Sequence, residues 1–563
     1  MAVSEEILNG TTNSSANGTI EEVDLVIIGA GPTGLLSGLL ARQLGLKICI
    51  LDAKEGPLQV GGADAITART QQYLEVASNF PYDRASRQDA GILPELINRG
   101  VKCNTSTTYA DGTFTSRQSH WWNSLSHTFY NNLLMIGQPF IERHFASYLD
   151  VPVHYAEPAL SFSHILNDDG TPQSVTVKTA KRTVKAKFCL ASDGAKSFVR
   201  NELDIAFEGT KPNMVWAVLD CWIDSTFPVT REIVTLQVDG ESRMAWIPRE
   251  RGMQRFYILL DGEITQAKAE ASIRRHMAPH PVEFTHVEWF SKFEIKERLA
   301  STFLHPTPLG PYILAGDSAH VHSVNGGQGM NTGLSDAFAL IWRLALLTRH
   351  PHLPSATQTA LLRSYDTERR ATAKEVIDVA AKLVRSTTAE AKGYVELIEK
   401  NAGFITGMGV KYWGVGSECV VEGGKRGVFG AGGRCPDLWV QGPEAQRLYQ
   451  MFRYGRYVLV TVGEEVGEGK RAQTRNEEVV KVVRLRPLKA LGMGVEREVE
   501  RIDEGDYAEE SFGCSYVKKG ERYAALVRPD CYVETVGEIE DVVEYLERRI
   551  PGTVGFEKTT NEV

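Results

Sequence analysis

A glycine-rich turn near the start of the chain constrains its fold more than any other feature. The apolar run 23–28 is typical of a buried parallel strand, and 35–41 has the composition of a helix. Between them stand Gly29, Gly31 and Gly34. In such a strand–turn–helix unit the first glycine permits the turn, the second lets the backbone approach a pyrophosphate, and the third allows close helix packing. The unit therefore predicts a Rossmann-type dinucleotide-binding domain.

An acidic residue at the end of the next strand supports this interpretation. The run 46–51 is strand-like and ends at Asp52. Its carboxylate follows the glycine-rich turn by about 20 residues, the offset expected of a ligand for a ribose hydroxyl. Because glycines of this spacing also occur in ordinary turns, the prediction depends on the strand, the helix and the acidic residue together.

A second glycine-rich segment, far along the chain, indicates which dinucleotide is bound. The strand-like run 311–315 precedes it, and the helix-like run 334–347 follows it. We expect the acidic residue of this segment to meet a ribityl hydroxyl, and its glycines to bring backbone N–H groups to an isoalloxazine ring at the positive end of the helix. The residues assigned to the cofactor here are Gly316, Asp317, Gly327, Gln328, Gly329, Met330 and Asn331.

A third motif lies between these two, in the run 191–200, and contains Asp193 and Gly194. The three motifs in this order resemble those of the class A flavoprotein aromatic hydroxylases, most closely the phenol 2-monooxygenase branch. The resemblance covers residues 22–390. It implies that Asp193 and Gly194 bind the cofactors, that FAD is the bound cofactor, and that NADPH or NADH is a transient reductant.

The resemblance also assigns candidate site residues. The segments 61–70, 136–143 and 247–257 look like the parts of phenol hydroxylases that supply an active-site aspartate, a glutamine against the flavin, and an arginine and tyrosine of the substrate pocket. Matching each family motif to this sequence residue by residue, the resemblance implies that Asp64, Arg249 and Tyr257 are catalytic and that Arg69 and Gln138 contact the cofactor.

These residue types suit hydroxylation of a phenol through a flavin hydroperoxide, the reaction that the resemblance implies. An ionised phenol is the stronger nucleophile, but a phenol titrates near pH 10, so the enzyme must help remove the proton. Tyr257 or Asp64, or both in a relay, would accept it. Arg249 would stabilise the phenolate or the negatively charged flavin intermediate. The sequence does not decide which residue is the base.

One departure from the family pattern leaves other functions open. Val324 stands in the stretch where the family usually places a proline, so the rigidity of this loop is in question. The leading hypothesis is hydroxylation of a phenol ortho to its hydroxyl. A second is decarboxylative or dearomatising hydroxylation, or epoxidation, of a hydroxybenzoate or polyketide-derived substrate. A third is a flavin-binding protein that no longer oxygenates, which the three catalytic candidates argue against.

Composition excludes several classes of protein. The 563 residues carry a net charge of −9, which argues against a nucleic-acid partner, and no run of about 18 apolar residues predicts a membrane span. Eight cysteines without paired spacing indicate reduced thiols and a cytoplasmic protein. His320 and His322 alternate near Asp317, but no cysteine accompanies them at ligand spacing, so no metal site is expected.

The fold class expected is α/β: a Rossmann-type FAD-binding domain, an antiparallel-sheet substrate domain and a C-terminal domain that resembles the family's thioredoxin-like domain. In the family this last domain contributes to dimerisation, so we expect a homodimer; no Cys-x-x-Cys is present, so thiol redox chemistry is not expected. The expected boundaries are a disordered tail at 1–21, the FAD-binding domain at 22–213 and 301–413, the substrate sheet at 214–300, a flexible glycine-rich linker at 414–434 and the thioredoxin-like domain at 435–563.

Overall fold

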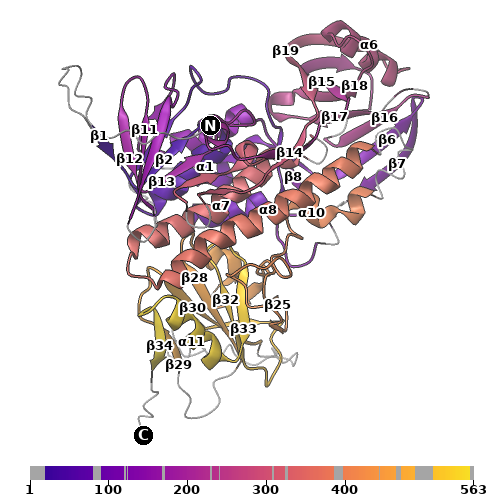
Figure 1. The fold of residues 1–563 in the computed structure, drawn as a ribbon. Helices are drawn as coiled ribbons and strands as arrows, with labels where there is room; N and C mark the ends of the chain where they lie inside the picture. The colour runs from indigo at the N-terminus through magenta and orange to yellow at the C-terminus, as the bar shows by residue number, and fades with distance from the viewer. Residues whose placement is uncertain are drawn as a thin grey trace, which may run out of the picture.

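The fold was analysed in a computed structural model (Figure 1). A region of α/β structure is built from residues before and after those of an antiparallel sheet, which extends from one side of it. The C-terminal region lies below, beneath the two long helices α7 (Gln328–Arg349) and α8 (Ser355–Arg385). The residues that the structure describes are 20–79, 91–119, 122, 125–167, 172–228, 231–239, 241, 243–306, 310–323, 327–385, 397–442, 444–463, 471–488 and 511–557.

A six-stranded sheet forms the centre of the α/β region. Five of its strands are parallel, and one edge strand is antiparallel. The central strands are fully buried, as expected of a parallel sheet covered on both faces. In spatial order the strands are β21 (Leu304–His305), β22 (Tyr312–Leu314), β13 (Phe188–Ala191), β2 (Leu25–Ile28), β3 (Ile48–Leu51) and β9 (Val153–His154).

The order of this sheet explains how three distant motifs meet. Strands β2, β13 and β22 are neighbours and run parallel, so their carboxyl ends lie at one edge of the sheet. The glycine-rich turn, the Asp193-Gly194 turn and the Gly316-Asp317 turn each follow one of these strands. Ligands of open α/β sheets bind at this edge. The sheet therefore assembles one site from three segments.

Helix α1 (Pro32–Gln43) covers the sheet and packs against α7. A Cβ on Gly38 would lie 2.7 Å from Ile50 Cδ1, so this glycine lets α1 approach the strands closely. The other helices of the region are α2 (Ala68–Ser78), α3 (Ile92–Arg99), α4 (Gln138–Ser147), α5 (Phe198–Glu202) and α10 (Ala402–Thr406). The smaller sheets contain β1 (Ile20–Glu22), β12 (Thr183–Ala186), β11 (Pro172–Lys178) and β10 (Ser161–Leu166); β14 (Phe207–Thr210), β20 (Glu297–Ala300) and β23 (His320–Val321); and β4 (Ala65–Ile66), β8 (Leu133–Met135) and β5 (Val101–Cys103).

A seven-stranded, largely antiparallel sheet occupies the region where the sequence predicts the substrate domain. The last two strands at one end of this sheet, β6 and β7, come from residues 105–119, outside the predicted range 214–300, and β6 pairs in parallel with β16. Helix α6 (Gln266–His276) packs on one face. In spatial order the strands are β19 (Val282–Glu294), β15 (Val215–Ser225), β18 (Gln254–Leu259), β17 (Met244–Pro248), β16 (Ile233–Gln237), β6 (Thr105–Ala110) and β7 (Thr113–Ser119).

The C-terminal region contains a second seven-stranded sheet. Strands β28 and β30 are parallel, whereas β32 and β33 continue the sheet in antiparallel fashion before α11 (Ile539–Arg549). In spatial order the strands are β27 (Ala445–Arg447), β26 (Trp439–Gln441), β31 (Ser511–Cys514), β30 (Val480–Pro487), β28 (Tyr457–Val462), β32 (Tyr523–Val527) and β33 (Val533–Gly537), and β29 (Arg471–Thr474) pairs with β34 (Val554–Glu557).

The glycine-rich segment 414–434 differs from the flexible linker that the sequence predicts. It contains the short hairpin strands β24 (Lys425–Arg426) and β25 (Phe429–Gly430) and packs on β33. Gly432 N donates to Val533 O at 2.7 Å, and a Cβ on Gly432 would lie 2.5 Å from Trp413 N. At Gly432 the missing side chain thus permits close backbone approach.

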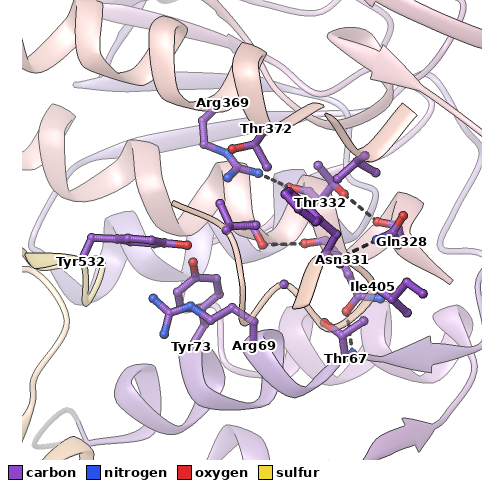
Figure 2. Close-up of a pocket in the computed structure, with 15 residues that line it drawn as sticks. Thr67, Arg69, Tyr73, Gln328, Asn331, Thr332, Arg369, Thr372, Ile405 and Tyr532 are labelled. Carbon is purple, nitrogen blue, oxygen red and sulfur yellow. Dashed lines mark hydrogen bonds between the residues drawn. The ribbon is translucent and has the colours of Figure 1, made fainter. Parts of the chain in front are cut away.

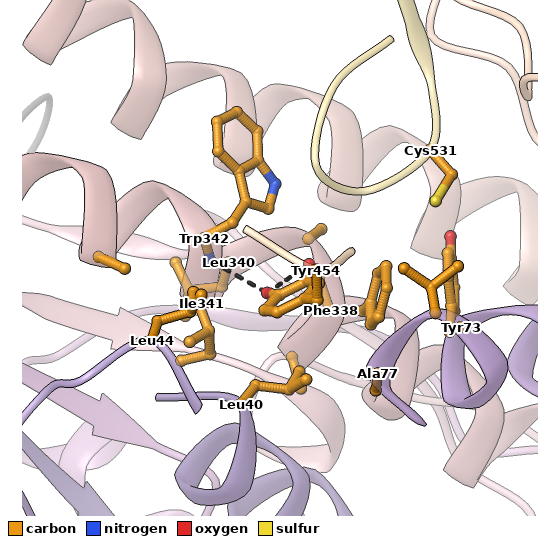
Figure 3. Packing of buried hydrophobic residues seen from close by; sticks show 14 of the residues in the cluster. Leu40, Leu44, Tyr73, Ala77, Phe338, Leu340, Ile341, Trp342, Tyr454 and Cys531 are labelled. Carbon is orange, nitrogen blue, oxygen red and sulfur yellow. Dashed lines mark hydrogen bonds between the residues drawn. The ribbon is translucent and has the colours of Figure 1, made fainter. Parts of the chain in front are cut away.

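The C-terminal region shares a hydrophobic core with α1, α2 and α7 (Figure 3). The ring of Tyr454 lies 4.4 Å from that of Phe338. Its hydroxyl accepts a hydrogen bond from Trp342 N at 3.0 Å and donates one to Phe338 O at 2.9 Å. A Cβ on Gly455 would lie 2.2 Å from Leu44 Cδ2, so the two regions are packed without space between them at this point.

A buried ion-pair network also joins the two regions. Glu368 on α8 pairs with Arg343 on α7 at 2.9 Å, and with Arg528 of the C-terminal sheet at 2.9 Å through the same carboxylate oxygen. Asp530 pairs with Arg528 at 2.8 Å and with Arg343 at 3.3 Å. Two carboxylates thus compensate two guanidinium groups that have almost no solvent exposure.

None of the helices in the described ranges is long and apolar enough to cross a membrane.

Candidate cofactor and active site

A cavity of about 550 Å³ lies at the carboxyl ends of β2, β13 and β22. Each of the three motifs contributes to its wall, and the antiparallel sheet closes it from the other side through β15 and β19. The lining residues that bear on the argument are Gly31, Asp64, Gln138, Gly194, Val218, Arg255, Tyr257, Trp289, Phe293, Asp317, His322, Gly327, Gln328, Gly329 and Met330.

The three glycines of the first turn have different surroundings. Gly29 has a φ of +106°, and a Cβ there would lie 2.3 Å from Ser192 O. A Cβ on Gly34 would lie 1.9 Å from Gly29 O, whereas one on Gly31 would meet no atom within 4 Å. Gly31 lines the cavity and precedes α1, whose N-terminus has no side-chain cap. This is the open, amide-rich cradle that a pyrophosphate requires.

Asp52 lies beside this turn but does not line the cavity in the structure. It is buried, and its Oδ2 accepts a hydrogen bond from Ala30 N at 2.6 Å. Its Oδ1 accepts one from Lys54 N at 2.7 Å. Both carboxylate oxygens therefore hold backbone amides, and the ribose contact of Asp52 stays a prediction.

The second and third motifs bring two carboxyl groups to the same edge. Asp193 Oδ1 is buried without a hydrogen-bond partner in the described part of the chain, and burial raises the pKa of Asp193. Gly194, at φ +82°, lines the cavity. Asp317 opens into the cavity, and the protein atoms around it raise the pKa of its carboxyl. Gly316 N donates to Asp336 at 2.9 Å, which fixes the Gly316-Asp317 turn.

The start of α7 forms a further part of the wall. Gly327 has a φ of +64° and is the N-cap of α7, without a side-chain cap. Gln328, Gly329 and Met330 follow it along the cavity. Asn331 instead turns away, donating to Ala65 O at 2.9 Å and accepting from Thr67 N at 2.9 Å. Asn331 thus positions the segment that carries Asp64. Val324, the residue at which the sequence departs from the family pattern, lies outside the described residues.

The candidate catalytic groups form a hydrogen-bonded cluster at the junction with the antiparallel sheet. Tyr257 donates to Asp64 Oδ2 at 2.8 Å. Arg255 Nη1 donates to the Tyr257 hydroxyl at 3.3 Å and lies 3.5 Å from Asp64 Oδ2. Burial is the main cause of the raised pKa of Tyr257, with the Asp64 carboxylate acting in the same direction. A neutral phenol thus lies between a carboxylate and a guanidinium group.

Arg255, which the sequence prediction did not assign, is the arginine of this cavity. Its guanidinium group donates to both oxygens of Asp220 at 2.6 Å, and these two residues are cross-strand partners on β18 and β15. The signal was present in the sequence, because residues two apart on a strand share a face and Arg255 precedes Tyr257 by two.

Arg249 lies outside the cavity, behind Asp220. It pairs with Glu250 through two hydrogen bonds of 3.0 Å, and its Nη1 lies 3.5 Å from Asp220 Oδ1. It lines a separate cleft. The structure therefore brings Asp64 and Tyr257 together and places Arg255, not Arg249, beside them.

The two remaining cofactor candidates differ in position. Gln138 lines the cavity, accepting from Ala63 N at 2.9 Å and donating to Glu142 at 2.8 Å. Arg69 lies in a smaller neighbouring cavity of about 30 Å³, which Figure 2 shows with Gln328 on its opposite side. The Arg69 guanidinium stands 4.9 Å from the ring centroid of Tyr532. Arg69 therefore contacts the C-terminal region and not the main cavity.

One group of potential metal ligands occurs in the described residues, namely Glu21, Cys49 and His154. The guanidinium group of Arg182 lies 3.1 Å from each ring nitrogen of His154, of which only the unprotonated one can accept a hydrogen bond, and it pairs with Glu21 at 3.2 Å. A guanidinium group therefore already supplies the cation at this position.

A family model described as an FAD-binding domain matches residues 22–380. The chain belongs to the FAD-binding-domain family. Its cofactor is therefore FAD, and the cavity fits it on structural grounds, because Gly31 leaves open space beside an uncapped helix terminus and Asp317 projects into the same space.

Curated relatives within the family include 3-hydroxybenzoate 4-monooxygenase of Comamonas testosteroni, 28% identical over 69% of this chain and 65% of the relative. The FAD-dependent monooxygenase ankC of Aspergillus thermomutatus is 29% identical over 63% of this chain and 61% of the relative. Phenol 2-monooxygenase fsqG of Aspergillus fumigatus is 28% identical over 70% and 66%. The chain thus matches slightly less than two thirds of the length of these relatives.

Solved structures share the fold over nearly the whole length of this chain. The OxyS anhydrotetracycline hydroxylase from Streptomyces rimosus aligns with a TM-score of 0.66 at 22% identity, covering 94% of this chain and 100% of that one. Aklavinone-11 hydroxylase in a ternary complex with FAD and aklavinone aligns with a TM-score of 0.69 at 19% identity, covering 94% and 99%. The likeness includes the C-terminal region.

Proposed function

We propose that this protein is an FAD-dependent monooxygenase that uses NAD(P)H and O2 to hydroxylate a phenolic aromatic substrate ortho to an existing hydroxyl. The observation that carries the proposal is the Tyr257 hydroxyl, which donates to Asp64 at 2.8 Å in the wall of the cavity that fits FAD. The names of two relatives, a hydroxybenzoate monooxygenase and a phenol monooxygenase, support a phenolic substrate.

Separate groups of residues would hold the cofactor. Gly31 and the N-terminus of α1 would receive the pyrophosphate, and Asp317 the ribityl chain. Gly329 and Met330, at the N-terminus of α7, would present backbone amides to the ring system. Bound FAD supplies the chemistry that passes electrons from NAD(P)H to O2 and one oxygen atom to the substrate.

The cluster at the junction would handle the substrate's proton. A phenol hydroxyl bound next to Tyr257 would donate to the tyrosine oxygen as Tyr257 releases its own proton toward Asp64. Arg255 would then lie near the resulting phenolate and stabilise its charge. Arg255 keeps its orientation because Asp220 holds two of its nitrogens.

The antiparallel sheet would exclude water from this proton transfer. Val218 on β15, and Trp289 and Phe293 on β19, line the cavity opposite the glycine-rich turn. Apolar walls of this kind lower the local dielectric constant and strengthen the interactions of Asp64 and Arg255 with the substrate.

We propose further that the C-terminal region is a thioredoxin-like domain beginning near residue 435, and that the protein is a cytoplasmic homodimer. The parallel pair β28 and β30, continued by antiparallel β32 and β33 and followed by α11, supports the domain assignment. The resemblance to the phenol 2-monooxygenase branch supports the dimer.

The proposed function is tested by following NADPH oxidation and oxygen uptake with a panel of phenols and hydroxybenzoates, and by analysing the products by mass spectrometry. A phenol that accelerates NADPH oxidation and gains one oxygen atom is the expected result. A product that also loses carbon dioxide would replace hydroxylation by its decarboxylative alternative. No oxygenated product from any phenol would overturn the proposal.

A further inference from the structure

A second cleft, of about 420 Å³, lies on the other side of the wall that carries the candidate catalytic groups. The last turn of α3 and the connection between β17 and β18 form it. Four arginines line this cleft, and Glu250 is the one acidic residue among its described lining residues. These arginines are Arg99, Arg231, Arg249 and Arg251.

The acidic residue of the cleft does not neutralise this charge. Both oxygens of Glu250 accept hydrogen bonds from Arg249 at 3.0 Å, so this pair is internally compensated. Arg231 is exposed and forms no ion pair with any residue in the described ranges. The cleft therefore retains positive charge on a chain whose net charge is −9.

The two remaining arginines have partners that an anion can replace. Arg99 pairs with Glu95 at 2.6 Å, and Arg251 with Glu288 at 3.0 Å, and neither glutamate lines the cleft. The side chains of Arg99 and Arg251 are 59% and 55% exposed. Ion pairs this exposed contribute about 1 kcal/mol or less, whereas a phosphate offers a guanidinium group two parallel hydrogen bonds.

The cleft and the FAD cavity share a wall of three charged groups. Arg249 Nη1 lies 3.5 Å from Asp220 Oδ1 on the cleft side. Arg255, which lines the cavity, holds the same carboxylate at 2.6 Å from the other side. One carboxylate thus separates the guanidinium groups of the two spaces, so a ligand in the cleft lies within a nucleotide's length of the candidate active site.

We propose that this cleft binds a phosphate group of the reducing pyridine nucleotide. The inference rests on the proposed function, since that reaction requires a nucleotide that carries several phosphate charges and reaches the FAD. The volume lies in the range of about 300–1,000 Å³ typical of ligand sites. Guanidinium groups match phosphate geometry and keep their charge at all relevant pH values.

The test is a double variant, Arg99→Gln with Arg231→Gln, in the full-length FAD-loaded protein. Binding of adenosine 2′,5′-bisphosphate is measured by calorimetry, and KM and kcat for NADPH and NADH are measured with a phenol. Arg548→Gln is the matched control, because Arg548 is also an exposed arginine, at 71% against 59% for Arg99, and it pairs with Glu544 with the same helical spacing as Arg99 with Glu95.

We expect the dissociation constant of the bisphosphate and KM for NADPH to rise about tenfold or more in the double variant, because two charge-assisted contacts are lost. FAD content and kcat should match the wild type, and the control should change by less than about twofold. An equal rise in KM for NADH assigns the cleft to the pyrophosphate, and no rise for NADH assigns it to the 2′-phosphate. Either outcome supports the proposal.

Unchanged binding of the bisphosphate in the double variant would overturn it. So would loss of inorganic phosphate binding without any effect on the nucleotide, because the cleft would then be an anion site unrelated to the reductant. The binding arm needs no turnover, so the two proposals fail separately. If the double variant loses bisphosphate binding and the wild-type protein oxygenates no phenol, the proposed role of the cleft is upheld and the proposed function is contradicted.

Discussion

Replacing Tyr257 by phenylalanine removes one hydroxyl from the centre of the candidate active site. That hydroxyl donates to Asp64 at 2.8 Å and accepts from Arg255 at 3.3 Å. A hydrogen bond to a charged group contributes about 1.5–3 kcal/mol, and Arg255 stays 3.5 Å from Asp64 in the variant, so we expect a loss of about 2 kcal/mol in the free energy of unfolding. The fold should therefore be retained.

The effect on hydroxylation should be larger than the effect on stability. If Tyr257 relays the substrate's proton to Asp64, its loss removes acid–base assistance of about 10²–10⁴-fold in the rate of product formation. Reduction of the flavin by NADPH needs no such proton transfer and should be nearly unchanged, so the variant should form hydrogen peroxide in place of product. The deficit should shrink between about pH 7 and pH 9.5, because more of the phenol then arrives ionised.

The assay compares product formed with NADPH oxidised across this pH range. Tyr454→Phe is the matched control, since it also removes a buried tyrosine hydroxyl with two hydrogen bonds, but one that does not line the cavity. It should lower stability by about 1–2 kcal/mol and leave the product yield per NADPH unchanged. A Tyr257→Phe variant with wild-type product yield and pH dependence would refute the relay.

Three further predictions concern the cofactor cradle, the interdomain network and acid stability. Gly31→Ala should fold with wild-type stability, because its Cβ meets no atom within 4 Å, but should lose bound FAD; Gly34→Ala, with a Cβ 1.9 Å from Gly29 O, should lower stability as well. FAD absorbance and thermal unfolding measure both, and FAD retained by Gly31→Ala would contradict the cradle. Glu368→Gln should lower the free energy of unfolding by about 3 kcal/mol, because Arg343 and Arg528 lose a shared buried carboxylate; a change below 1 kcal/mol by denaturant titration would show the network to be dispensable. Burial and nearby His320 lower the pKa of His322 to about 4, below the unfolded value of 6.5, so stability should fall by about 3 kcal/mol as pH drops from 6.5 to 4. His322→Gln should flatten that part of the stability profile, and a profile identical to the wild type would refute the assignment.

Local sequence rules determine the backbone of the glycine-rich turn at the carboxyl edge of the sheet. Gly29 and Gly34 have no room for a side chain and Gly31 faces open space, as the strand–turn–helix pattern predicts. The adjacency of the Asp193-Gly194 and Gly316-Asp317 turns could be expected only through the family resemblance, because the order of strands in a sheet is a long-range property that local patterns do not encode.

The side-chain assignments were less complete for the same reason. Arg249 and Arg255 stand near each other in sequence, and which of them faces the cavity depends on strand alternation and on the pairing of Arg255 with Asp220 across β15 and β18. Arg69 lies against Tyr449 and Tyr532 of the C-terminal region, the nearer of them 380 residues away in the chain, and no local signal could reveal these contacts.

The most direct test of the account is incorporation of oxygen from ¹⁸O2 into a phenol by the purified FAD-loaded protein with NADPH. The account predicts a catechol-type product two mass units heavier than that formed in ¹⁶O2, with the new hydroxyl ortho to the first and loss of this product in Tyr257→Phe. NADPH oxidation that yields only hydrogen peroxide with every phenol tested, or a product whose added oxygen comes from water, would contradict it.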